Sequence, residues 1–218
     1  MDLTVETAQG PGRLVVAEAT GAPSTVLLLG HGAGGGVEAF DLRALADVLP
    51  AAGVTVVRYS QPWREAGRKV AVSPPRLDEA WAPAVEVVAT RWPSVPLVVG
   101  GRSAGARVAC RWAATHEVMG VVALSFPLHP PGRPEASRVD ELAGARAPLL
   151  VVQGESDPFG RPDEIRDAID AADHAGDRTL VEVPGARHGL EPHRVGDDPA
   201  TRVAAIVGPV REFLTRVG

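Results

Sequence analysis

Three polar residues follow short apolar runs in the chain, and their types could together perform nucleophilic chemistry. Ser103 lies within GGRSAGA, Asp157 within GESDPFG and His188 within GARHGL. A serine hydroxyl is a weak nucleophile near neutral pH, so an imidazole must take its proton and later give it to the leaving group. A carboxylate then fixes the tautomer of that imidazole and stabilises the imidazolium. The set, in the order Ser, Asp, His, therefore predicts acyl transfer with Ser103 as nucleophile, Asp157 as acid and His188 as base.

The segment around Ser103 predicts a buried strand, a sharp turn and the start of a helix. Leu97 to Val99 form an apolar, β-branched run, and good helix formers with helical apolar spacing begin at Ala104. The pattern G-x-S-x-G spans the turn and is typical of a nucleophile elbow, which lifts the serine oxygen above the sheet. A helix that starts here directs free N–H groups toward charge that develops at the serine.

A second loop supplies backbone donors for that charge. The apolar strand Ser24–Leu29 leads into HGAGGG at residues 31–36. Loops of this kind carry an oxyanion donor beside a nucleophile elbow, so we expect the N–H groups of Ala33 and Ala104 to form the oxyanion hole. A glycine-rich loop also suits a phosphate, but the chain has neither G-x-x-x-x-G-K-[ST] nor a G-x-G-x-x-G that opens the next helix.

Each candidate has a structural alternative or a rival nearby. Asp157 precedes a proline and could be a turn or capping residue, and Glu155 is a second acid two positions away. His188 could be a surface histidine, with His193 as the rival base. His31 belongs to the glycine loop and is expected to be structural. The remaining cysteine and histidines, namely Cys110, His116, His129 and His174, show no metal-ligand spacing, and Cys110 is expected to fill the core.

The elements that must position these residues alternate between strand and helix. This order predicts a mostly parallel, doubly wound α/β sheet flanked by helices, with the sites at the carboxyl ends of its strands. The chain of 218 residues suits one domain, 1–218. Predicted strands cover 3–6, 13–19, 24–29, 54–59, 97–99, 118–125, 148–153 and 179–183, and predicted helices cover 37–51, 76–91, 104–116, 139–142, 162–171 and 201–217; segment 60–75 is expected to be a loop.

Composition excludes several classes of function. A net charge of −5 gives no footprint for nucleic acid, and no apolar run is long enough to cross a membrane, so we expect a cytoplasmic protein. We expect no cofactor and no metal, and a small acyl compound as the partner. Four basic side chains on predicted loops could attract an anionic substrate or could simply face solvent: Arg64, Arg68, Lys69 and Arg133.

Four segments carry a resemblance to a known family. LLLGHGAGGG, VVGGRSAGARVA, LLVVQGESDPFG and VPGARHGL resemble small, lidless α/β-hydrolases related to dienelactone hydrolase, and most closely the KANL/Tex-type predicted hydrolases. The resemblance covers residues 24–216 and implies the α/β-hydrolase fold without a large cap. Dienelactone hydrolase has a cysteine where this chain has Ser103, so its substrate is not implied. Some relatives have scaffold roles.

Two hypotheses follow from these patterns. The first is a serine hydrolase, similar to a carboxylesterase, that cleaves ester or thioester bonds through an acyl-enzyme and needs no cofactor. The second is a hydrolase-fold binding or regulatory protein with little catalysis. The geometry of Ser103 and His188 separates them, because a separation within about 3.5 Å with Asp157 behind the imidazole favours catalysis.

Overall fold

Eight strands form one sheet in a computed structural model that describes residues 1–172, 176–193 and 195–218. The order is β1-β2-β4-β3-β5-β6-β7-β8; β1–β2 and β2–β4 pair antiparallel, and all other pairs are parallel. The strands are β1 (Asp2–Val5), β2 (Gly12–Ala17), β3 (Thr25–Gly30), β4 (Val54–Ser60), β5 (Leu97–Arg102), β6 (Gly120–Leu124), β7 (Leu149–Gly154) and β8 (Arg178–Val183). The expected mostly parallel sheet is therefore confirmed, with the β1–β2 hairpin at one edge.

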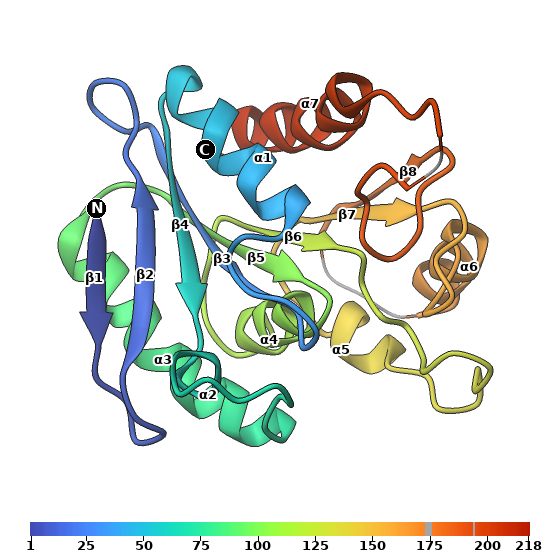
Figure 1. The fold of residues 1–218 in the computed structure, drawn as a ribbon, viewed down its shortest axis with the longest axis horizontal. Helices are drawn as coiled ribbons and strands as arrows, with labels where there is room; N and C mark the ends of the chain where they lie inside the picture. The colour runs from blue at the N-terminus through green and yellow to red at the C-terminus, as the bar shows by residue number, and fades with distance from the viewer. Residues whose placement is uncertain (173–175, 194) are drawn as a thin grey trace.

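Helices cover both faces of this sheet (Figure 1). One face packs against α1 and α7, and the other against α3, α4, α5 and α6. The helices are α1 (Phe40–Val48), the 3₁₀ turn η1 (Leu49–Ala52), α2 (Pro62–Glu65), α3 (Pro74–Arg91), α4 (Ala104–Ala113), α5 (Val139–Ala143), α6 (Pro162–Ala171) and α7 (Pro199–Val217). Two apolar layers therefore enclose the sheet, and its central strands contact both layers.

The central strands are buried on both faces, which explains their continuous apolar sequences. Every residue of β3, β6 and β7 is buried. Parallel strands covered by helices on both sides lack the alternation of polar and apolar residues found in half-exposed strands. The large side chains of Trp81, Tyr59 and Phe126 are fully buried within the core.

Most sequence-based boundaries lie within a few residues of those in the structure, and two segments differ in the kind of element that they form. The helix expected over 37–51 is α1 followed by η1, whose second residue is Pro50. The segment expected to be a loop at 60–75 contains the short helix α2, which begins at Pro62. Proline suits a first helical position, because that N–H would have no partner in the helix.

No cap is inserted after β6, because residues 125–138 contain neither helix nor strand.

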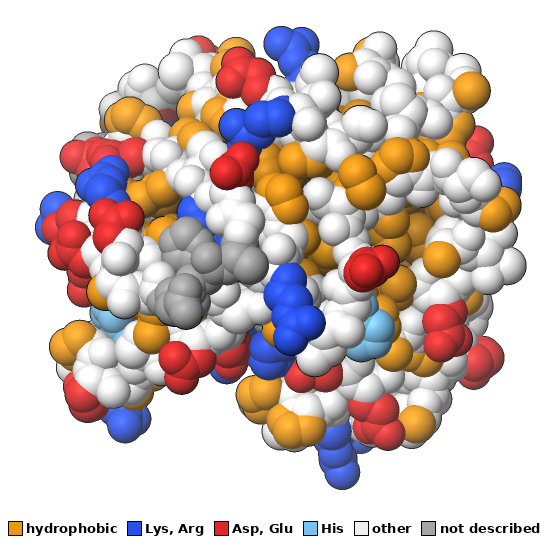
Figure 2. Space-filling model, turned by 180° about the vertical axis from the view of Figure 1, so that it is seen from behind, with side chains coloured by type: hydrophobic (Ala, Val, Ile, Leu, Met, Phe, Trp, Pro, Cys, Tyr) orange, Lys and Arg blue, Asp and Glu red, His pale blue; other side chains and the backbone are white. Residues whose placement is uncertain are grey.

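The surface carries charges of both signs. On the face shown in Figure 2, Lys and Arg side chains are interspersed with Asp and Glu. Within the described residues, no helix is long and apolar enough to cross a membrane. His174 lies outside the described residues.

Candidate active site

Ser103 lies at a strained turn between β5 and α4. Its backbone has φ 53° and ψ −110°, a conformation that non-glycine residues rarely adopt. The turn is tight because β5 and α4 both contact β3: a Cβ on Gly101 would come within 2.5 Å of the Gly30 oxygen, and a Cβ on Gly105 would overlap the main chain of Gly30. The two glycines of G-x-S-x-G are therefore required by packing against β3, and the turn presents Ser103 at the carboxyl edge of the sheet.

The imidazole of His188 joins the other two candidates. Its Nε2 lies 2.9 Å from Ser103 Oγ, and its Nδ1 lies 2.8 Å from Asp157 Oδ2. The side chain of His188 is 20% exposed and that of Asp157 is fully buried. The ring of Phe159 packs against the imidazole, with ring centroids 4.3 Å apart. The structure thus brings His188 together with Asp157, 31 positions before it in the chain, and with Ser103, 85 positions before it.

Two donors orient the carboxylate of Asp157. The Phe159 N–H donates to Oδ1 at 2.9 Å, and Gln153 Nε2 donates to Oδ2 at 2.9 Å. Gln153 is fully buried at the end of β7 and also donates to the Gly160 carbonyl at 2.7 Å. Gln153 was not singled out from the sequence, although a polar residue that ends an entirely apolar buried strand is a detectable signal.

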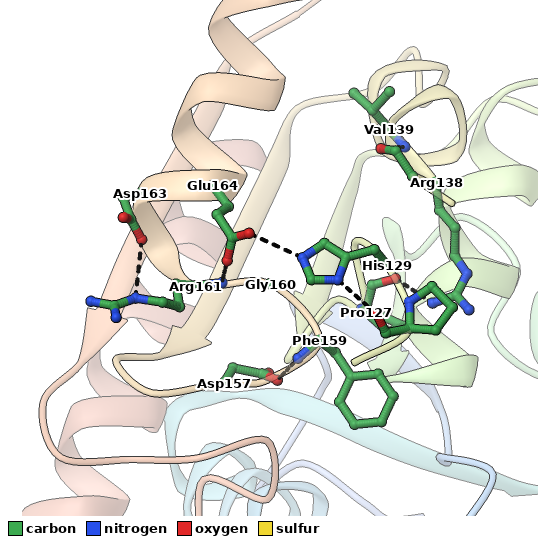
Figure 3. A network of polar contacts seen from close by, with 12 residues as sticks. Pro127, His129, Arg138, Val139, Asp157, Phe159, Gly160, Arg161, Asp163 and Glu164 are labelled. Atoms are coloured by element: carbon green, nitrogen blue, oxygen red, sulfur yellow. Dashed lines mark hydrogen bonds and ion pairs between the residues drawn. The ribbon is translucent and has the colours of Figure 1, made fainter. Parts of the chain in front are cut away.

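The loop that carries Asp157 is tied to α6 and to the segment after β6 (Figure 3). The His129 N–H donates to the Phe159 carbonyl at 3.0 Å, and His129 Nε2 lies 3.1 Å from Glu164 Oε1. The other carboxylate oxygen of Glu164 accepts the Arg161 N–H at 2.8 Å, at the start of α6. These contacts fix the part of the loop that follows Asp157, from Phe159 to the start of α6.

The rival residues have other partners. Glu155 accepts a hydrogen bond from the Gly185 N–H at 2.5 Å, and the His193 N–H donates to Asp197 at 2.9 Å. His31 is buried, with Nδ1 2.8 Å from the Gly32 carbonyl and Nε2 accepting the Gln61 N–H at 3.1 Å. Burial lowers the pKa of His31. His31 is therefore a neutral imidazole that ties the glycine loop to the end of β4.

The glycine loop lies directly beside Ser103. A Cβ placed on Gly32 would stand 3.4 Å from Ser103 Cβ. The N–H groups of Ala33 and Ala104 have no hydrogen-bond partner among the described residues. Ala104 is the first residue of α4, where an N–H has no acceptor within the helix. Both expected oxyanion donors are thus unpaired close to Ser103.

The four basic loop residues are not gathered at the site. Arg64 reaches the glycine loop, since a Cβ on Gly36 would lie 3.4 Å from its Nε. Arg133 pairs instead with Glu135 at 3.4 Å on the exposed surface, and Arg68 and Lys69 are exposed.

The remaining features of the chain lie away from Ser103. Burial raises the pKa of the core residue Cys110 to about 12. Within the described residues, no three His, Cys, Asp or Glu side chains are grouped as metal ligands. A cavity of about 850 Å³ lies at the opposite edge of the sheet, beside Leu97, Met119 and Ala147.

Comparison with known proteins gives one family match and many similar folds. The family described as alpha/beta hydrolase domain matches residues 23–214. An alpha-beta serine hydrolase homologue from Coxiella burnetii is 18% identical, with a TM-score of 0.76 over 99% of this chain and 96% of that chain. XC6422 from Xanthomonas campestris, an a/b serine hydrolase without lid, is 22% identical, with a TM-score of 0.73 over 98% and 94%. Est1E from Butyrivibrio proteoclasticus is 14% identical, with a TM-score of 0.75 over 99% and 98%. No curated protein sequence matches the chain.

Proposed function

The chain belongs to the alpha/beta hydrolase domain family, and from this premise we propose that it is a serine hydrolase that cleaves ester or thioester bonds. Ser103 is the nucleophile, His188 the general base and acid, and Asp157 the carboxylate behind the imidazole. The observation that carries the proposal is the continuous chain of short contacts, 2.9 Å from Ser103 to His188 and 2.8 Å from His188 to Asp157. A binding protein with no turnover has no need of this alignment, so the geometry favours the catalytic hypothesis.

The first half of the reaction forms an acyl-enzyme. Ser103 Oγ attacks the carbonyl carbon of the substrate while its proton passes to His188 Nε2. The tetrahedral intermediate collapses, the bond from carbon to the leaving oxygen or sulfur breaks, and the imidazolium gives its proton to that leaving atom. Asp157 holds Nδ1 protonated and stabilises the imidazolium. In the second half, water attacks the acyl-enzyme with His188 as base, and the acid product leaves Ser103 free.

The negative charge of each tetrahedral intermediate falls on the former carbonyl oxygen. The N–H groups of Ala33 and Ala104 stabilise it, and the amino end of α4 adds its dipole. Removing one such donor typically costs about 3 kcal/mol in the transition state. The role of the glycine loop is therefore to place the Ala33 N–H so that it and the Ala104 N–H donate to the same oxygen.

The substrate is a small acyl compound that approaches an open site. His188 is partly exposed, and no helical cap follows β6. A site without a cap does not enclose the acyl group, so it does not select acyl groups by their fit to a closed pocket. A carboxylesterase that acts on small or accessible acyl chains fits this site best. A panel of esters and thioesters of increasing acyl length would define the preferred bond.

A serine-directed fluorophosphonate tests the proposal. We expect it to label the wild-type protein and not Ser103→Ala, and we expect His188→Gln to lower both labelling and ester hydrolysis by roughly 10³-fold or more. His193→Gln, at the neighbouring histidine whose Nδ1 lies 3.9 Å from Asp197 Oδ2, is the matched control and should label normally. Folded wild-type protein that resists the reagent and hydrolyses no ester would refute the proposal.

A further inference from the structure

The side chain of Arg102, next to Ser103 in sequence, extends toward the loop that carries His188. Its Nη2 donates to the main-chain carbonyl of His188 at 3.4 Å, and its Nε lies 3.5 Å from Asp41 Oδ2. The side chain is 17% exposed. Arg102 therefore connects the nucleophile turn, the histidine loop and the first turn of α1.

Asp41 anchors the arginine from inside the protein. Its side chain is fully buried, and its Oδ1 accepts the Leu42 N–H at 2.9 Å. Within the described residues, Asp41 Oδ2 and Arg102 Nε have no hydrogen-bond partner, so the ion pair between them is what compensates both buried groups. Breaking a buried pair leaves an uncompensated charge, which is costly. Asp41 therefore holds the guanidinium in one place.

The main chain of His188 depends on this arginine. The Arg102 hydrogen bond is the only one that reaches the main chain of His188 from the described residues. Two residues later, Leu190 has a φ of 58°, so the loop turns sharply just beyond the histidine. Asp157 and Phe159 hold the imidazole, while Arg102 holds the peptide from which it projects.

Resting on the proposed function, we propose that Arg102, anchored by Asp41, is a positioning residue that fixes the peptide of His188 and so keeps its imidazole within reach of Ser103. Its guanidinium forms an ion pair with Asp41 through Nε and donates a hydrogen bond to the His188 carbonyl through Nη2. It acts through His188 and does not contact the reacting atoms.

The test compares Arg102→Met with a matched arginine at the other edge of the sheet. Arg178 also donates to main-chain carbonyls, including Ala147 at 2.9 Å, but lies at the start of β8. We expect Arg102→Met to lower kcat for p-nitrophenyl acetate and the rate of fluorophosphonate labelling about 10- to 100-fold, because a displacement near 1 Å has effects of that size. KM should stay within about threefold. Arg178→Met should retain the wild-type kcat even if its thermal midpoint falls.

Two further variants keep the test decisive if Arg102→Met does not fold. Arg102→Lys retains the charge but cannot present a rigid fork to both acceptors, and Asp41→Asn removes the anchoring charge. Each should lower kcat about three- to tenfold. A crystal structure of any folded variant should show a longer separation between His188 Nε2 and Ser103 Oγ.

Different outcomes overturn different claims. A wild-type protein that is neither labelled nor active overturns the proposed function and this inference with it. Labelled, active wild type with Arg102 and Asp41 variants whose kcat stays within twofold of its value overturns this inference alone. An equal loss of kcat in Arg178→Met would also overturn it, since a general loss of packing would then explain the effect.

Discussion

At the scale of single residues, the candidate site depends on a buried carboxylate that must stay oriented without water. Asp157 is 1% exposed and accepts hydrogen bonds from a main-chain N–H, from His188 and from Gln153. A buried polar group loses its contacts with water, so each protein donor helps to hold this carboxyl group in one orientation. Of these three donors, Gln153 is the one side chain that takes no part in the proposed proton transfers, so it can be changed without altering Ser103, His188 or Asp157.

We predict that Gln153→Met lowers the free energy of unfolding by about 1.5–3 kcal/mol, the usual contribution of a hydrogen bond to a charged group. The rate of ester hydrolysis should fall as well, because the carboxylate gains freedom to turn away from His188. Urea denaturation and p-nitrophenyl acetate hydrolysis measure the two effects. Gln9→Met is the matched control, since Gln9 donates to the exposed carboxylate of Glu79 and its loss should change stability by less than about 0.5 kcal/mol. Similar losses in both variants would contradict the assigned role of Gln153.

Residue types and local spacing were enough to select Ser103, Asp157 and His188 from the sequence. Each follows an apolar strand and stands in a recognisable turn, and this information is local. The roles of Arg102 and Asp41 could not be predicted in this way. Their contact joins positions far apart in the chain, and an aspartate in the first turn of a helix ordinarily favours the helix dipole and faces solvent. The burial of Asp41 depends on how α1 packs over β5.

At the scale of elements, the turn that holds Ser103 exists because three backbones meet without side chains between them. Gly30 and Gly101 are paired in register across β3 and β5, and Gly105 in the first turn of α4 lies against Gly30. The G-x-S-x-G pattern predicted the turn correctly, but the partner glycine on β3 was not identified. Its requirement becomes visible only when the strand order places β3 next to β5.

We predict that Gly105→Ala destabilises the protein by roughly 1–3 kcal/mol or more, because the added Cβ overlaps the main chain of Gly30 and neither backbone can move freely. The turn that holds Ser103 should shift with α4, so fluorophosphonate labelling should slow. Gly34→Ala is the control for stability: a Cβ there has no atom within 4 Å, and the change should affect unfolding by less than about 1 kcal/mol. A Gly105→Ala protein as stable as Gly34→Ala would show that α4 is not held against β3.

The length and regularity of an element decided whether it could be predicted from the sequence. Buried strands such as β3 and β7 have long apolar sequences bounded by turns, so their positions were clear. The short helix α2 was missed because one turn of helix has too few residues to show a period. The end of α1 was missed because Pro50 is accommodated in a 3₁₀ turn, which apolar spacing does not distinguish from a continued helix.

At the scale of the whole molecule, parallel strand direction gathers distant residues at one edge of the sheet. Ser103 follows β5, Asp157 follows β7, His188 follows β8 and the glycine loop follows β3. Since the carboxyl ends of parallel strands share an edge, the alternating pattern of elements was sufficient to expect this meeting. The same arrangement buries Asp41, because α1 packs across the sheet close to that edge.

The buried carboxylate of Asp41 makes the stability of the whole protein depend on pH. Burial raises its pKa to about 6; Arg102 opposes this rise and Glu191 adds to it. The folded protein therefore retains a proton on Asp41 between about pH 4 and pH 6 that the unfolded chain, with an ordinary aspartate pKa, has released. Stability falls as pH rises through this interval, by roughly 3 kcal/mol for a shift of about two pH units, and then levels off.

We predict that Asp41→Asn removes this dependence. The unfolding free energy of the variant minus that of the wild type should increase by roughly 3 kcal/mol from pH 4 to pH 7, whatever the offset between them at pH 4. Urea denaturation at a series of pH values measures this difference, and Asp47→Asn, at an exposed carboxylate of the same helix, controls for the loss of one negative charge. If Asp41→Asn and Asp47→Asn gave the same pH profile, Asp41 would have to be solvated or fully compensated in the folded protein. If Asp41 were solvated, Arg102 would lack the buried anchor on which its positioning role depends.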